Sequence, residues 1–123
     1  APGMKYRHYA PRAEVILADG PTPEARAGVA LRLAQNSPGR CRILATEETC
    51  GFYGGQDCVI MGSSKRPETL CAALFHCLRQ ADRDGVARVV LEALPPEALG
   101  LAYMNRALRA AGFRVALPTA GEF

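Results

Sequence analysis

The run Glu14-Val15-Ile16-Leu17-Ala18-Asp19 and the turn Gly20-Pro21-Thr22-Pro23-Glu24 directly after it decide how this chain folds. The run is short, apolar and without polar alternation, which predicts a β-strand buried on both faces. The turn ends that strand, and Thr22, Pro23 and Glu24 then supply an N-cap, a first-turn proline and a first-turn acid for a helix. A buried strand followed at once by a helix is the building unit of a parallel sheet.

The same unit recurs along the chain. Further strands are predicted at 41–46, 57–62, 86–94 and 113–117, and helices at 23–36, 67–82 and 95–111. The segment 47–56, with its glycines, is predicted as a loop or a short irregular helix. This alternation predicts an α/β protein, a small three-layer Rossmann-like domain whose mostly parallel sheet of about five strands carries helices on both faces.

Apolar spacing predicts which side of each helix faces the sheet. The inward positions are Ala27, Ala30, Leu31 and Ala34 in the first helix, then Leu70, Leu74, Cys77, Leu78 and Ala81 in the second, then Leu101, Met104, Leu108 and Ala111 in the third. Gly112 is the expected C-terminal cap of the third helix.

The first twelve residues differ from the rest of the chain. Prolines bracket a run of cations and aromatic rings, Lys5, Tyr6, Arg7, His8 and Tyr9. We expect residues 1–12 to form an extended linker, 13–118 the Rossmann-like domain and 119–123 a frayed tail. Such a linker suits an anionic, planar ligand, because the rings stack and the cations meet phosphate. The alternative is a solvated N-terminal tail whose charges keep it soluble.

The charge balance disfavours a general nucleic-acid surface on the folded body. The net charge is +3, and Lys5, Arg7 and Arg12 account for all of it, since 12 cations and 12 acids remain. Local basic patches at Lys65-Arg66 or at Arg106 with Arg109 stay open. No apolar run approaches the roughly 20 residues of a membrane span, so a soluble protein is expected.

Five cysteines, an odd number without a C-x-x-C pair, indicate reduced thiols in the cytoplasm. Four of them, Cys41, Cys58, Cys71 and Cys77, are expected to be buried and structural, and their spacing does not suit zinc. Cys50 lies in a loop and is expected to be the reactive one.

The folded body carries no motif for catalysis or for cofactor binding. The phosphate-binding G-x-G-x-x-G is missing after the first strand, and the glycines of 51–55 precede a strand instead of opening a helix. His76 is expected to pack its ring at the edge of a helix. Glu92 is a carboxylate inside a strand for which the sequence identifies no partner.

Three segments resemble a known family, the long, two-domain form of L-threonylcarbamoyladenylate synthase. Residues 1–11, APGMKYRHYAP, are similar to the S/A-P-G-M-x-Y-x-H-Y-x-P signature of the linker between its two domains. Residues 74–86 are similar to its L-F-x-x-L-R-x-x-D-x-x-G-V segment, and residues 99–111 to its G-L-G-x-A-x-x-N-R-x-x-K-A-A ending. The cysteines and the loop 51–56 depart from the family pattern.

The resemblance implies a C-terminal accessory domain that is inactive alone and binds no cofactor itself. The parent enzyme converts threonine, bicarbonate and ATP, with Mg, into threonylcarbamoyl-AMP and pyrophosphate for tRNA modification. Its catalytic site would belong to a YrdC-like domain preceding Ala1. Lys5, Tyr6, Arg7, His8 and Tyr9 would then contact that site as a lid.

Two other functions stay open. The body is an alternative docking module for tRNA or for a partner protein of tRNA modification, to which Arg106 and Arg109 give slight support. It is otherwise a regulatory nucleotide-binding domain, with its site at the carboxyl ends of the strands, where open α/β sheets bind ligands.

Overall fold

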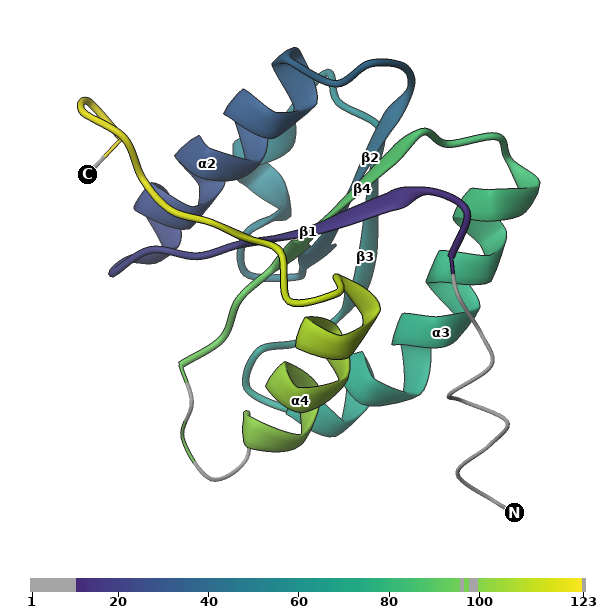
Figure 1. Ribbon diagram of the computed structural model, residues 1–123. Coiled ribbons are helices and arrows are strands. Elements are labelled where there is room, and N and C mark those ends of the chain that lie inside the picture. The colour runs from purple at the N-terminus through teal and green to yellow at the C-terminus, as the bar shows by residue number, and fades with distance from the viewer. Residues whose placement is uncertain (1–10, 96, 98–99, 123) are drawn as a thin grey trace.

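A five-stranded parallel sheet forms the middle layer of the computed structural model, which describes residues 11–95, 97 and 100–122 (Figure 1). The strand order is β3-β2-β4-β1-β5, and every pairing is parallel. The strands are β1 (Glu14–Ala18), β2 (Cys41–Thr46), β3 (Cys58–Gly62), β4 (Arg88–Glu92) and β5 (Val115–Ala116). The helices are α2 (Pro23–Gln35), the 3-10 helix η1 (Cys50–Tyr53), α3 (Pro67–Arg83) and α4 (Leu101–Ala110).

Helices cover both faces of this sheet, which confirms the predicted three-layer architecture. Figure 1 shows α2 on one side of the strands and α3 with α4 on the other. The two apolar clusters divide in the same way, since Val29 and Ile43 belong to the α2 side and Leu74 and Val89 to the side of α3 and α4. Alternate residues of each central strand therefore enter opposite cores, which is why these strands are apolar throughout.

The order of the strands makes β2 and β4 the switch point of the sheet. From β2 the chain continues outward to the edge strand β3, whereas from β4 it crosses to the opposite edge strand β5. The connections from these two neighbouring strands thus lead in opposite directions. In open α/β sheets, ligands usually bind outside the carboxyl ends of such a strand pair, which here are Thr46 and Glu92.

The predicted inner face of α3 is confirmed, because Leu70, Leu74, Cys77, Leu78 and Ala81 are all buried. The prediction for α4 is partly wrong. The helix begins at Leu101 instead of Pro95, and Tyr103, Ala107 and Ala111 face the core while Leu101 is 49% exposed. The Tyr103 hydroxyl donates to the Glu92 carbonyl oxygen at 2.9 Å, which fixes the rotation of α4 about its axis.

Glycines with positive φ end α3 and α4. Gly85 and Gly112 have φ of 72° and 59°, and Gly112 is the cap that the sequence predicts. Each is followed by a bond from the next N–H to a carbonyl five residues earlier, Val86 to Ala81 and Phe113 to Leu108. Phe113 itself has φ of 61°, so β5 cannot begin there and is shorter than the predicted strand.

The C-terminal segment is held on α2 instead of being frayed. The Arg32 guanidinium donates to a Glu122 carboxylate oxygen at 2.9 Å and to the Leu117 carbonyl oxygen at 2.7 Å. Glu122 also accepts from the Thr119 amide at 2.7 Å, and this bond is the main reason why the pKa of Glu122 lies below its usual range.

Among the helices in the described part of the chain, none combines the length and apolar character of a membrane span.

Gly100 allows a close approach between the start of α4 and the chain that leads into it. A Cβ at this position would lie 2.7 Å from the Pro95 carbonyl oxygen. We expect Gly100→Ala to lower the free energy of unfolding by about 1–3 kcal/mol, because backbone atoms would have to move. Gly54→Ala is the matched control, since its Cβ would meet nothing within 4 Å and its φ is −55°. Denaturant unfolding that gives equal stability for both variants would contradict this prediction.

Candidate functional site

The predicted lid residues Lys5, Tyr6, Arg7, His8 and Tyr9 lie outside the described residues. The described chain shows where the linker meets the domain. Arg12 is exposed, and the next residue, Ala13, is buried among the side chains that α3 and α4 cover. The chain therefore enters the core between Arg12 and Ala13, and the division into linker and domain stays a prediction.

Asp82, near the end of α3, holds the chain at this entry point. Its carboxylate accepts hydrogen bonds from the Arg12 amide, 3.1 Å to each oxygen, and from the Ala13 amide at 3.0 Å. The Arg12 guanidinium in turn donates to the Asp82 carbonyl oxygen at 3.3 Å. Two successive backbone N–H groups that would need water or a sheet partner are thus bound by one side chain.

A second polar cluster surrounds Glu92 at the switch point between β2 and β4. The Glu92 carboxylate accepts from the Tyr53 hydroxyl at 2.5 Å, the Thr49 hydroxyl at 2.7 Å and the Thr46 amide at 3.2 Å. Burial raises the pKa of Glu92, and these three donors act in the opposite direction. Burial likewise raises the pKa of Tyr53 far above its usual range, so this hydroxyl stays a donor.

The expectation that Glu92 has no partner is therefore wrong. Its donors are Thr46 at the end of β2, Thr49 directly before η1 and Tyr53 at the end of η1, and the sequence predicts this segment only as a loop or a short irregular helix. A signal was present, because Thr46 and Thr49 follow one strand and Glu92 ends another, and carboxyl ends of parallel strands meet at one edge. At the edge where such sheets usually bind ligands, these side chains hydrogen-bond to one another.

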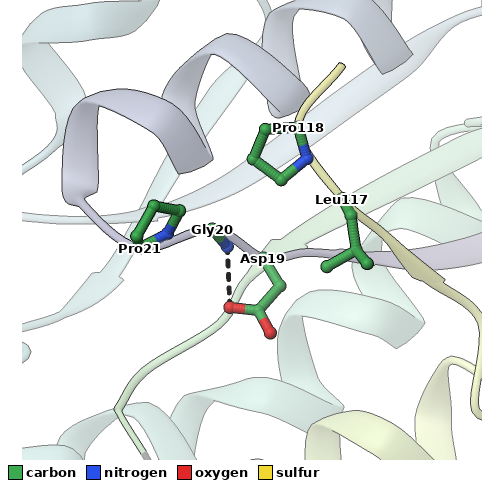
Figure 2. A pocket seen from close by; sticks show the side chains of 5 residues that line it. All are labelled: Asp19, Gly20, Pro21, Leu117 and Pro118. Carbon is green, nitrogen blue, oxygen red and sulfur yellow. Dashed lines mark hydrogen bonds between the residues drawn. The ribbon is translucent and has the colours of Figure 1, made fainter. Parts of the chain in front are cut away.

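An open hollow lies at the carboxyl end of β1, and Figure 2 shows its lining. It is lined by Asp19, Gly20, Pro21, Leu117 and Pro118. The Asp19 carboxylate accepts from the Gly20 amide at 2.8 Å, so this amide is already bound (Figure 2). A phosphate group at this position would meet a carboxylate and two prolines that have no N–H, which disfavours a nucleotide site after β1.

The cysteines and His76 only partly follow the predictions. Cys77 is buried as expected, whereas Cys41, Cys58 and Cys71 are half-buried, because they lie at strand starts or on the flank of α3. Burial raises the pKa of Cys41 and of Cys58 to about 11, so both stay protonated at neutral pH.

His76 is exposed on α3 instead of packing its ring. Within the described residues, no group of three or more potential ligand side chains could hold a metal ion.

Comparison with known protein families decides the identity of this domain. Residues 1–112 match the family model "Threonylcarbamoyl-AMP synthase, C-terminal domain". The chain belongs to this family. The match includes the linker, the Asp82 segment and α4, so the threonylcarbamoyl-AMP synthase resemblance seen in the sequence is confirmed.

Curated relatives share this domain as one part of a longer protein. The threonylcarbamoyl-AMP synthases of Bacillus subtilis (strain 168) and Pyrococcus abyssi are 38% and 36% identical to this C-terminal domain over 115 residues. In both cases the match covers 94% of this chain and 33% of the relative. The chain therefore spans about a third of the length of these synthases.

Solved structures of the family have the same fold. P. abyssi Sua5 complexed with L-threonine aligns with a TM-score of 0.69 at 34% identity, covering 94% of this chain and 33% of the other. The C-terminal Sua5 domain from Pyrococcus horikoshii aligns with a TM-score of 0.62 at 28% identity, covering 87% of this chain and 98% of the other. The second match shows that the C-terminal synthase domain has been crystallised as a separate unit in that relative.

The Glu92 cluster yields a prediction about stability. We expect Tyr53→Phe to lower the free energy of unfolding by about 1–3 kcal/mol, because a buried carboxylate loses a donor. The Tyr53 hydroxyl stabilises the ionised form of Glu92, so its loss raises the pKa of Glu92 further. The destabilisation should therefore grow as pH rises through the Glu92 pKa of the wild type and level off above the higher Glu92 pKa of the variant. Phe52→Leu, at the neighbouring 41% exposed ring, is the control, and an equal effect of both variants at all pH values would contradict the prediction.

Proposed function

We propose that this domain is the accessory domain of a threonylcarbamoyl-AMP synthase and that its linker gates the active site. The parent protein would combine threonine, bicarbonate and ATP, with Mg, into threonylcarbamoyl-AMP and pyrophosphate for the threonylcarbamoyladenosine modification of tRNA. A YrdC-like domain, N-terminal in the same protein, would hold the catalytic site. The family match and the relative crystallised with L-threonine support this assignment.

One observation supports the gating role: the folded domain forms hydrogen bonds with the backbone shortly after the predicted lid residues. Asp82 binds the Arg12 and Ala13 amides, and the last predicted lid residue, Tyr9, is only three residues away. An extended chain of three residues reaches about 10–11 Å. Because the domain binds the backbone at Arg12, in this proposal Tyr9 stays within that length of the attachment.

The lid residues have the chemistry that a carbamoyl-adenylate site requires. Tyr6 and Tyr9 can stack on adenine, and Arg7 can form two parallel hydrogen bonds with phosphate. A closed lid also excludes water, and this protects a mixed anhydride from hydrolysis. In this proposal the linker does the chemical work and the domain fixes one end of it.

The edge of the sheet where α/β proteins usually bind ligands is consistent with a supporting role for the folded body. At the ends of β4 and β1, the Glu92 carboxylate binds the Tyr53 hydroxyl and the Asp19 carboxylate binds the Gly20 amide. In this proposal the described body acts as a support for the linker. We further propose that the parent protein acts in the cytoplasm, which the free thiols fit.

A docking role for tRNA or a partner protein is the second candidate. Arg106 and Arg109 are both exposed on α4 and are three residues apart, so they share one side of the helix. Phosphate contacts of this kind make binding strongly salt-dependent. Salt-dependent binding of tRNA to this chain would favour docking over a purely mechanical role.

The isolated chain is expected to be catalytically inactive. With ATP, threonine and bicarbonate it should release no pyrophosphate above background, because no described residue offers a catalytic constellation. The same assay on the two-domain protein, in which the catalytic domain precedes this chain, should give clear turnover. Turnover by the isolated chain would contradict the division of labour between the domains.

The linker prediction is tested by Arg7→Ala in the two-domain protein. Loss of a phosphate-binding guanidinium should reduce kcat/KM for threonylcarbamoyl-AMP formation by roughly tenfold or more. Arg109→Ala, which removes an exposed arginine from α4, is the matched control and should leave this rate unchanged. Equal rates for the wild type and Arg7→Ala would argue that the linker is a solvated connector.

A further inference from the structure

Asp82 is a carboxylate at an electrostatically unfavourable place. It lies in the last turn of α3, which ends at Arg83, and the C-terminal end of a helix carries partial negative charge. An acid there is destabilising by itself, so its presence calls for a compensating interaction. The two amides of Arg12 and Ala13 provide that compensation, at 3.0–3.1 Å.

The geometry of this contact fixes a direction as well as a position. The Arg12 amide is shared by both carboxylate oxygens, while the Ala13 amide points at one of them. A third bond runs back from the Arg12 guanidinium to the Asp82 carbonyl oxygen at 3.3 Å. Because successive amides are bound by one side chain, the backbone at 12–13 cannot rotate without breaking a charge-assisted bond.

The residues next to Asp82 are held by packing and by backbone hydrogen bonds. Ala81 is completely buried, and the Val86 amide donates to its carbonyl oxygen at 3.0 Å. Gly85, with φ of 72°, turns the chain directly from α3 towards β4. On the other side of the contact, the Glu14 amide donates to the Ala87 carbonyl oxygen at 2.9 Å, which begins the sheet one residue after Ala13.

We propose that Asp82 is a positioning residue for the linker, because it fixes the direction of the chain at Arg12 and Ala13, where the linker joins the domain. This role rests on the proposed gating function. It also gives a physical reason for the aspartate of the 74–86 segment, which is 70 residues from Arg12 in sequence and contacts it directly. Asp82 touches no substrate in this proposal and acts only through the linker.

The test uses the two-domain protein with four single variants, of which Arg7→Ala is described above, and one double variant. Asp82→Ala removes the acceptor, Asp82→Asn keeps one side-chain oxygen that can accept an N–H, and Glu68→Ala is the control. Glu68 is an exposed acid in the first turn of α3, so its removal changes the same charge on the same helix at the opposite end. Each variant is measured for kcat and KM of threonylcarbamoyl-AMP formation, for thermal unfolding and for hydrogen exchange of the Arg12 and Ala13 amides.

We expect Asp82→Ala to speed exchange of the two amides about tenfold or more and to reduce kcat/KM roughly tenfold. Asp82→Asn should recover part of both losses, and Glu68→Ala should change neither. The double variant Asp82→Ala with Arg7→Ala should be no slower than Arg7→Ala alone, because both changes disable the same linker. Partial rescue by Asp82→Asn at equal Tm separates positioning from a general loss of stability.

Two results would overturn the inference and are distinguishable from each other. If Arg7→Ala slows the reaction but Asp82→Ala does not, or if their effects multiply, the linker gates and Asp82 does not position it. If Arg7→Ala has no effect, the gating function itself is wrong, and the role assigned to Asp82 falls with it.

Discussion

A carboxylate removed from water must be hydrogen-bonded, and Glu92 imposes this requirement at the centre of the sheet. It ends β4, the strand between β2 and β1. Thr46 at the end of β2, and Thr49 and Tyr53 in the β2–β3 connection, donate to its side chain. The Tyr103 hydroxyl donates to its carbonyl oxygen. The buried carboxylate of Glu92 thus holds η1 against the end of β2, and the backbone carbonyl of the same residue holds Tyr103 of α4.

The polar groups at the carboxyl ends of β2 and β4 bind one another. The fold usually carries its chemistry where diverging connections leave room, and here Thr46, Thr49 and Tyr53 donate hydrogen bonds to Glu92 at that place. A carboxylate at the end of α3, that of Asp82, instead binds the backbone of Arg12 and Ala13 before β1. The sheet therefore has the linker end bound near the start of β1, whereas at the carboxyl ends of β2 and β4 the side chains hydrogen-bond to one another.

Sequence alone was sufficient wherever a local pattern determined the structure. The apolar runs located the strands, and the i, i+4, i+7, i+8, i+11 spacing gave the inner face of α3 residue by residue. It failed for α4, because the Tyr103 bond to Glu92 is a tertiary contact that overrides the apparent apolar stripe. It also missed the partners of Glu92 and of Asp82, which lie 39 to 70 residues away in sequence. Only the arrangement of the strands brings such residues together.

The two borders of the sheet differ in a way that matters for association between molecules. At β5 only Val115 and Ala116 pair with β1, Arg32 already binds the Leu117 carbonyl oxygen, and Pro118 follows. A foreign strand finds almost no hydrogen-bonding groups there. The border at β3 is five residues long and carries Ile60 at 50% exposure. Resistance to aggregation in this domain therefore depends on how well β3 is shielded.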